Sequence, residues 1–116
     1  ILVVEDTKTN QIVIQLMLSR LGYNVTLADN SKQAVELIKN DEQFDLIFMD
    51  ISMPVMDGIE ATKQIRAKSL SVPIIALTAH TMDDDKDECL KAGMNDFMLK
   101  PMRINEISSV IERFTA

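Results

Sequence analysis

Five short apolar runs alternate with longer amphipathic segments, and this alternation strongly limits the folds open to the chain. The runs cover residues 1–4, 25–28, 46–49, 74–77 and 97–99. They are too short for helices and continuously apolar, as strands covered on both faces should be. Strands that alternate with helices predict a parallel sheet with helices on both faces and right-handed crossovers. The sequence therefore predicts an α/β fold, a doubly wound sheet of five parallel strands with five helices.

The segments between the runs carry apolar residues at helical spacing. In the first segment we expect the buried face to consist of Ile12, Val13, Leu16, Met17 and Leu21, with Gly22 ending the helix. The second helix should begin at Ser31 as its N-cap. The remaining helices should start near residues 57–58, after residue 81 and near residue 104.

Composition and charge exclude several classes of protein. A chain of 116 residues with 47% apolar residues suggests one domain with its own core, here residues 1–116, and we expect it to be part of a longer protein. The net charge of −6 opposes binding to nucleic acid or to an anionic membrane. The single cysteine, Cys89, cannot form an internal disulfide, and no apolar run approaches the roughly 18 residues of a membrane span. We therefore expect a cytoplasmic domain, whose parent protein could still be anchored in the inner membrane.

The strongest functional signal is the stretch DLIFMDISMPVMDG, residues 45–58. An apolar run delivers Asp50 into a loop that contains Pro54 and closes with the turn signal Asp57-Gly58. Parallel α/β sheets bind their ligands beyond the carboxyl ends of the strands. A buried strand that ends on a carboxylate therefore presents a reactive group, and Asp50 is the candidate.

Other polar residues follow the predicted strands at the same edge of the sheet. Glu5 and Asp6 follow the first strand, Thr78 the fourth and Lys100 the fifth. Two carboxylates about 4 Å apart repel by about 4 kcal/mol at an effective dielectric near 20, so three need a cation or a raised pKa. We expect Glu5, Asp6 and Asp50 to hold Mg²⁺ or Mn²⁺, which take oxygen ligands. Asp50 would then accept a phosphoryl group, whose charge Lys100 offsets and whose oxygen Thr78 hydrogen-bonds.

The motifs ILVVED, DISMPVMDGIEAT, IIALTAH and FMLKP occur in this order along nearly the whole chain. In order and spacing the chain resembles the response-regulator receiver domains of two-component signalling, and in particular the receivers of hybrid sensor histidine kinases. The resemblance implies a flavodoxin-like sheet with strand order 2-1-3-4-5. It also implies a phosphorelay, in which a sensor histidine kinase or a histidine phosphotransfer domain exchanges phosphate with the receiver.

Carried over position by position, the resemblance assigns roles to individual residues. Asp50 matches the phospho-acceptor, and Asp6 with its neighbour Glu5 matches the metal-binding acids. The backbone carbonyl of Ser52 would be a further metal ligand. Thr78 and Phe97 match the switch hydroxyl and the switch aromatic, which act on the face made by the fourth helix, fifth strand and fifth helix.

The resemblance also bears on three positions around these motifs. Lys100 matches the family's lysine, and the bond before Pro101 is commonly cis in the family. We expect Ser52 and His80 to tune the lifetime of the phosphate by controlling access of water. Glu5 replaces the more usual aspartate, and Thr7 stands where such receivers often have asparagine.

Other interpretations fit parts of the pattern. An aspartate-nucleophile phosphohydrolase commonly has a second aspartate two residues after the nucleophile, where this chain has Ser52. An interaction module that has lost phosphorylation usually lacks an acid, the hydroxyl or the lysine, and this chain retains them all. Glu5 and Asp6 alone would also fit a solvated helix start. We therefore expect a phospho-acceptor domain rather than an enzyme, either free-standing or part of a hybrid kinase.

Overall fold

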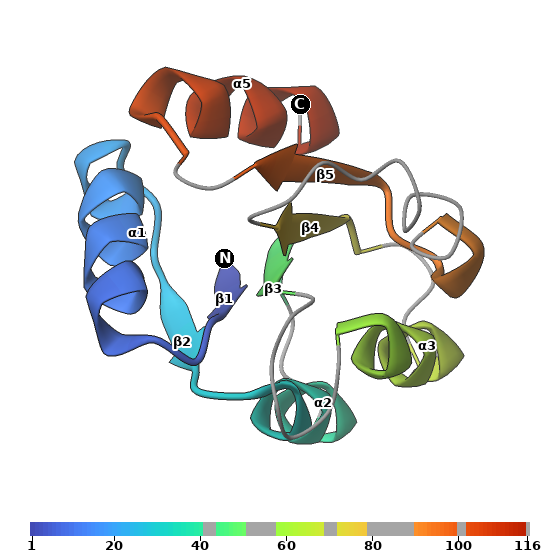
Figure 1. Cartoon of the computed structure of the whole chain (residues 1–116). Coiled ribbons are helices and arrows are strands. Elements are labelled where there is room, and N and C mark those ends of the chain that lie inside the picture. Colours follow the sequence, from blue (N-terminus) through green and yellow to red (C-terminus); the bar gives the residue numbers. More distant parts are fainter. Residues whose placement is uncertain (41–43, 51–57, 69–71, 79–89, 100–101, 116) are drawn as a thin grey trace.

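A computed structural model describes residues 1–40, 44–50, 58–68, 72–78, 90–99 and 102–115. Its strands are β1 Leu2–Val4, β2 Thr26–Ala28, β3 Ile47–Asp50, β4 Ile74–Thr78 and β5 Asp96–Leu99. Its helices are α1 Lys8–Arg20, α2 Ser31–Lys39, α3 Gly58–Lys68 and α5 Ile104–Thr115 (Figure 1). Residues 90–92 are also helical, and the remainder of the helix expected before them lies outside the described residues.

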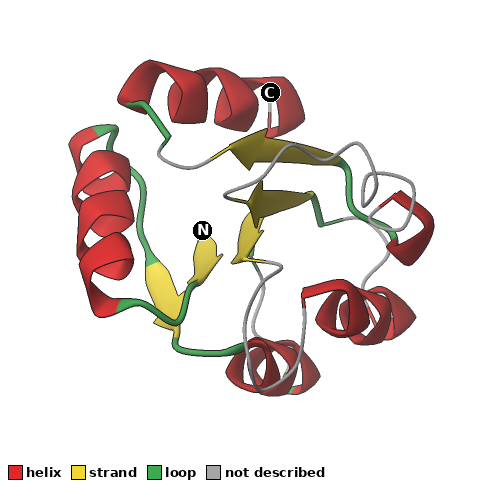
Figure 2. Ribbon diagram, in the orientation of Figure 1, coloured by secondary structure: helices red, strands yellow, loops and turns green. Residues whose placement is uncertain are grey.

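The five strands form one parallel sheet in the order β2-β1-β3-β4-β5, as predicted. Helices α1 and α5 cover one face of the sheet, and α2 and α3 cover the other (Figure 2). Adjacent strand residues enter opposite layers: Phe48 packs with the α1 and α5 side, whereas Ile47 and Met49 pack with the α2 and α3 side. This double burial explains why the strands read as continuous apolar runs.

The buried face predicted for α1 is largely wrong. The buried residues are Gln11, Ile14 and Leu18, whereas Ile12, Val13 and Leu16 are exposed. Met17 and Leu21 are partly buried and pack beside that face. Apolar residues occur nearly all round this helix, so their spacing alone does not determine which side faces the sheet.

The helix ends agree in part with the prediction. Gly22 follows α1 at a φ of +90°, a left-handed conformation typical of the residue after a helix, as expected. The N-cap of α2 is Asn30 rather than Ser31, because the Asn30 side chain accepts a hydrogen bond from the Gln33 N–H at 2.9 Å. Within the described ranges, no helix combines the length and apolar character required to cross a membrane.

Arg66 links the C-terminal half of α3 to the segment before β5. Its Nε donates to the Gly93 carbonyl at 2.9 Å, and its Nη2 donates to Asn95 Oδ1 at 2.8 Å. Asn95 Oδ1 also accepts the Ile74 N–H at 2.9 Å, at the start of β4. Burial lowers the pKa of the Arg66 guanidinium from its ordinary value, but a guanidinium stays charged in proteins. One cation therefore links α3 to the segment before β5 and, through Asn95, to the start of β4.

Candidate metal centre

The predicted acids meet where two neighbouring strands end. In the register between β1 and β3, Val4 lies opposite Met49, so the next residues, Glu5 and Asp50, are adjacent. Glu5 is fully buried, and Asp50, the last residue of β3, is only 4% exposed. Asp6 is exposed at the beginning of the loop into α1. The strand ends thus bring together residues separated by more than forty positions in the chain.

One carboxylate oxygen from each of Glu5, Asp6 and Asp50 lies within 4.8 Å of the other two. At such a separation two charges repel by roughly 3–4 kcal/mol at an effective dielectric near 20. A divalent cation would remove this repulsion, and an all-oxygen donor set suits Mg²⁺ or Mn²⁺. Mg²⁺ usually keeps several of its waters, and the exposure of Asp6 gives this cluster a side that faces solvent. The residues present therefore fit such an ion.

In the described part of the chain, Thr7 and Asn10 both donate to the Glu5 carboxylate. The Thr7 N–H and the Asn10 Nδ2 both donate to Glu5 Oε1, each at 3.3 Å. The Thr7 hydroxyl also donates to Asp6 Oδ1 at 3.4 Å. Thr7 thus contacts both acids, Glu5 through its backbone and Asp6 through its side chain.

Gln11 is a part of this region that sequence reasoning missed. Its side chain is 3% exposed, and its Nε2 donates to the Glu5 carbonyl at 2.6 Å and to Asp29 Oδ1 at 2.8 Å. The available signal was its spacing, because Gln11, Ile14 and Leu18 occupy one helical face. A glutamine on an inward face implies partners that satisfy its amide.

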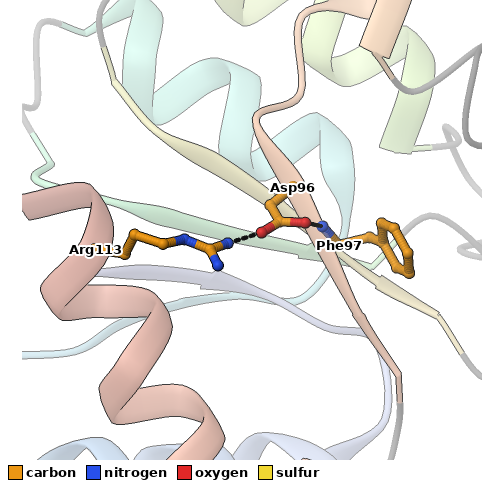
Figure 3. A network of polar contacts seen from close by, with 3 residues as sticks. All are labelled: Asp96, Phe97 and Arg113. Carbon is orange, nitrogen blue, oxygen red and sulfur yellow. Dashed lines mark hydrogen bonds and ion pairs between the residues drawn. The ribbon is translucent and has the colours of Figure 1, made fainter.

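Thr78 lies on β4, the strand beside Asp50, and Phe97 lies on β5, one strand further along the sheet. Asp50 is paired with Leu77, and Thr78 is the next and last residue of β4, where it is buried. Phe97 on β5 is half-buried and packs against the core on the α2 and α3 side. Figure 3 shows Phe97 beside Asp96, whose Oδ1 accepts the Phe97 N–H at 2.8 Å.

Four of the predicted site residues lie outside the described residues: Ser52, His80, Lys100 and Pro101. The expected backbone ligand, the tuning of phosphate lifetime, the charge-offsetting lysine and the cis peptide bond therefore stay predictions.

A doubly wound parallel sheet with three acids gathered at adjacent strand ends defines a class of α/β domain suited to cation-assisted chemistry on anionic groups. Over residues 1–112 the chain matches the response regulator receiver domain family. It therefore belongs to the response regulator receiver domains, the receivers of two-component signalling.

Individual relatives agree with this family. The chain is 40% identical over 122 residues to the osmosensing histidine protein kinase SLN1 of Saccharomyces cerevisiae, covering 100% of this chain but 10% of SLN1. Among solved structures, it resembles the receiver domain of sensor histidine kinase PA1611 from Pseudomonas aeruginosa, which has magnesium in its active-site cleft. That match has 45% identity and a TM-score of 0.89, covering 98% of this chain and 94% of the other.

A second structure shows a receiver with a partner. The Ssk1 receiver of Saccharomyces cerevisiae, solved with the histidine phosphotransfer protein Ypd1, has 35% identity and a TM-score of 0.88. The match covers 98% of this chain and 86% of that one. Because the chain spans only a tenth of SLN1, likeness to that kinase concerns its receiver region alone.

Proposed function

We propose that Asp50 accepts a phosphoryl group from a phosphohistidine in a phosphorelay, in a reaction that depends on Mg²⁺ or Mn²⁺ held by Glu5, Asp6 and Asp50. The observation that carries this proposal is the clustering of these three carboxylates within 4.8 Å in a receiver domain. The backbone carbonyl of Ser52 is proposed as a further ligand.

In the transfer, a carboxylate oxygen of Asp50 attacks phosphorus, a P–O bond forms and the P–N bond of the donor breaks. The electron pair of that bond returns to the imidazole, which carries a proton on its other ring nitrogen and therefore leaves as a neutral histidine side chain. The cation, when bound, supplies positive charge that offsets the phosphoryl oxygens. Lys100 adds a second positive charge, and the low exposure of Asp50 limits the access of water to the product.

Phosphorylation would shift a two-state equilibrium. The new phosphoryl oxygens draw in the hydroxyl of Thr78, which lies one strand from Asp50. Phe97, half-buried on the next strand, then fills the space that Thr78 vacates. The altered surface includes β5 and α5, and Ser52 and His80 set how long the phosphate lasts.

The proposed partners are a sensor histidine kinase, a histidine phosphotransfer domain or both, as the names of SLN1 and of the Ssk1–Ypd1 complex suggest. Helix α1 offers the docking surface, since it begins two residues after Asp6 and exposes Ile12, Val13 and Leu16. We propose that residues 1–116 act in the cytoplasm as one receiver of a longer protein. The domain undergoes phosphorylation and slow dephosphorylation and does not turn over other substrates.

The test is intact-mass analysis after incubation with acetyl phosphate, with and without Mg²⁺. The proposal expects one phosphoryl adduct that requires Mg²⁺ and is absent from Asp50→Asn. Asp45→Asn is a matched control, because Asp45 is an exposed acid just before the same strand. An adduct of equal yield in both variants would refute the assignment.

A further inference from the structure

We propose that Asn10 and Gln11, adjacent on α1, are positioning residues that hold Glu5 for metal binding and so set the metal affinity of the site. The inference rests on the proposed function insofar as Glu5 is a metal-binding acid. It concerns two residues that neither belong to the acid cluster nor act on the phosphoryl group.

Asn10 acts on the side chain of Glu5. A fully buried glutamate has one more rotatable bond than an aspartate and must be fixed before it can present an oxygen to a cation. The Asn10 amide and the Thr7 N–H converge on the same oxygen, Oε1, each at 3.3 Å. Two donors on one oxygen restrain the position of that oxygen and so limit the rotation of the carboxylate.

Gln11 acts on the backbone of Glu5. Its Nε2 donates at 2.6 Å to the Glu5 carbonyl and at 2.8 Å to Asp29 Oδ1, so one amide nitrogen joins the loop after β1 to the loop after β2. Asp29 is anchored in turn, because its N–H donates to the Gln33 side chain on α2 at 2.7 Å. This network fixes the point from which the Glu5 side chain departs.

The restraints that Asn10 and Gln11 place on Glu5, one on its side chain and one on its backbone, therefore come from a single turn of α1. Residues that orient a metal ligand without touching the metal raise the affinity of the site for the metal, because the ligand is already ordered before the metal binds. We expect Asn10→Ala and Gln11→Met each to weaken metal binding roughly tenfold, the lower end of the range for such partners. Gln11→Met conserves the length and volume of the side chain but removes both hydrogen bonds.

The experiment titrates unphosphorylated protein with Mn²⁺ and follows the electron paramagnetic resonance signal of the free ion. Gln15→Met is the matched control, since Gln15 is an exposed glutamine on the same helix. Thermal unfolding of each variant without metal, followed by circular dichroism, reports the fold separately from the affinity. The inference expects weaker Mn²⁺ binding by Asn10→Ala and Gln11→Met, an unchanged Gln15→Met and little change in the metal-free melting of Asn10→Ala.

A double-mutant cycle separates positioning from a general structural role. In a Glu5→Asp background the shorter carboxylate withdraws from Asn10, so adding Asn10→Ala should change Mn²⁺ affinity by less than about twofold. An Asn10→Ala effect of equal size in both backgrounds would overturn the role of Asn10 toward Glu5. The cycle decides this even if Gln11→Met fails to fold.

The outcome also distinguishes this inference from the proposed function. Wild-type protein that binds Mn²⁺, with both Asn10→Ala and Gln11→Met within about twofold of it, would overturn the positioning roles and leave the metal site intact. Wild-type protein that binds no Mn²⁺ would overturn the metal site and the inference together.

Discussion

Arg113 on α5 forms an ion pair with Asp96 on β5 (Figure 3). The other oxygen of the Asp96 carboxylate accepts the backbone N–H of Phe97 at 2.8 Å. The Asp96 carboxylate therefore joins α5 to the backbone of Phe97, the proposed switch aromatic on β5, the last strand of the sheet. A change at Phe97 would therefore reach the surface of α5 through two contacts.

We expect Arg113→Gln to have a small effect on stability and a larger effect on the surroundings of Phe97. The Arg113 side chain is 60% exposed, so solvent screens the ion pair and its loss should cost less than about 1 kcal/mol. Urea denaturation measures the stability, and the ¹⁵N–¹H resonance of Phe97 measures the local effect. Arg103→Gln, an exposed arginine just before α5, is the control. A loss above about 2 kcal/mol would contradict the screened pair.

The two glycines with positive φ should respond differently to alanine. Gly22, at φ +90°, has nothing within 4 Å of an added Cβ, so Gly22→Ala should cost only the conformational strain, about 1 kcal/mol. At Gly93, at φ +112°, the added Cβ would lie 2.7 Å from Arg66 Cγ. The Arg66 guanidinium is held by Gly93 and Asn95 and cannot simply swing away.

Gly93→Ala should therefore destabilise the domain by at least about 1 kcal/mol more than Gly22→Ala in chemical denaturation. In an Arg66→Ala background the clash is absent, and the additional cost of Gly93→Ala should shrink. Equal costs at Gly22 and Gly93 would show that the contact with Arg66 does not constrain the site.

Leu16 on α1 should matter for the partner and not for the chemistry. Its side chain is 65% exposed, and burying a leucine in an interface contributes roughly 1.5–3 kcal/mol. We expect Leu16→Ala to slow phosphotransfer from a phosphohistidine donor about tenfold or more while phosphorylation by acetyl phosphate stays unchanged. Leu90→Ala, which truncates another exposed leucine, should change neither rate. Equal slowing with both phosphodonors would place the effect of Leu16 in the acceptor site.

Thr78 should couple phosphorylation to Phe97 without being needed for the transfer. Thr78→Ala removes the hydroxyl, and we expect it to keep the phosphoryl adduct but lose the change in the Phe97 amide resonance on phosphorylation. Thr78→Ser keeps the hydroxyl and should keep the response. If Phe97 responds in Thr78→Ala as in the wild type, the switch does not pass through Thr78.

The strands and the acid cluster could be predicted because their signals are local. Continuous apolar runs mark strands buried on both faces, and parallel strands bring Glu5 and Asp50 to the same edge whatever the connections do. The N-cap of α2 was missed by one residue, since Asn30 and Ser31 are both good capping residues. In the structure the Asn30 side chain accepts the Gln33 N–H, whereas Ser31 is buried.

The side of α1 that is buried and the hydrogen bonds that hold Glu5 both depend on tertiary contacts. Leu16 and Ile14 are equally apolar, and only the position of the sheet leaves the first exposed and buries the second. Asn10 and Gln11 would be ordinary helix residues without Glu5 and Asp29 beside them. Asp29 follows β2, eighteen residues after Gln11, and no local pattern relates the two positions.

The most direct measurement maps the phosphoryl group after transfer from a phosphohistidine donor in Mg²⁺. Borohydride reduces an aspartyl phosphate to homoserine, so tandem mass spectrometry of the reduced protein identifies the acceptor residue. The account predicts homoserine at position 50, none in Asp50→Asn and none when Mg²⁺ is removed. Reduction at Glu5 or Asp6 instead, or a phosphoryl adduct that persists in Asp50→Asn, would contradict it.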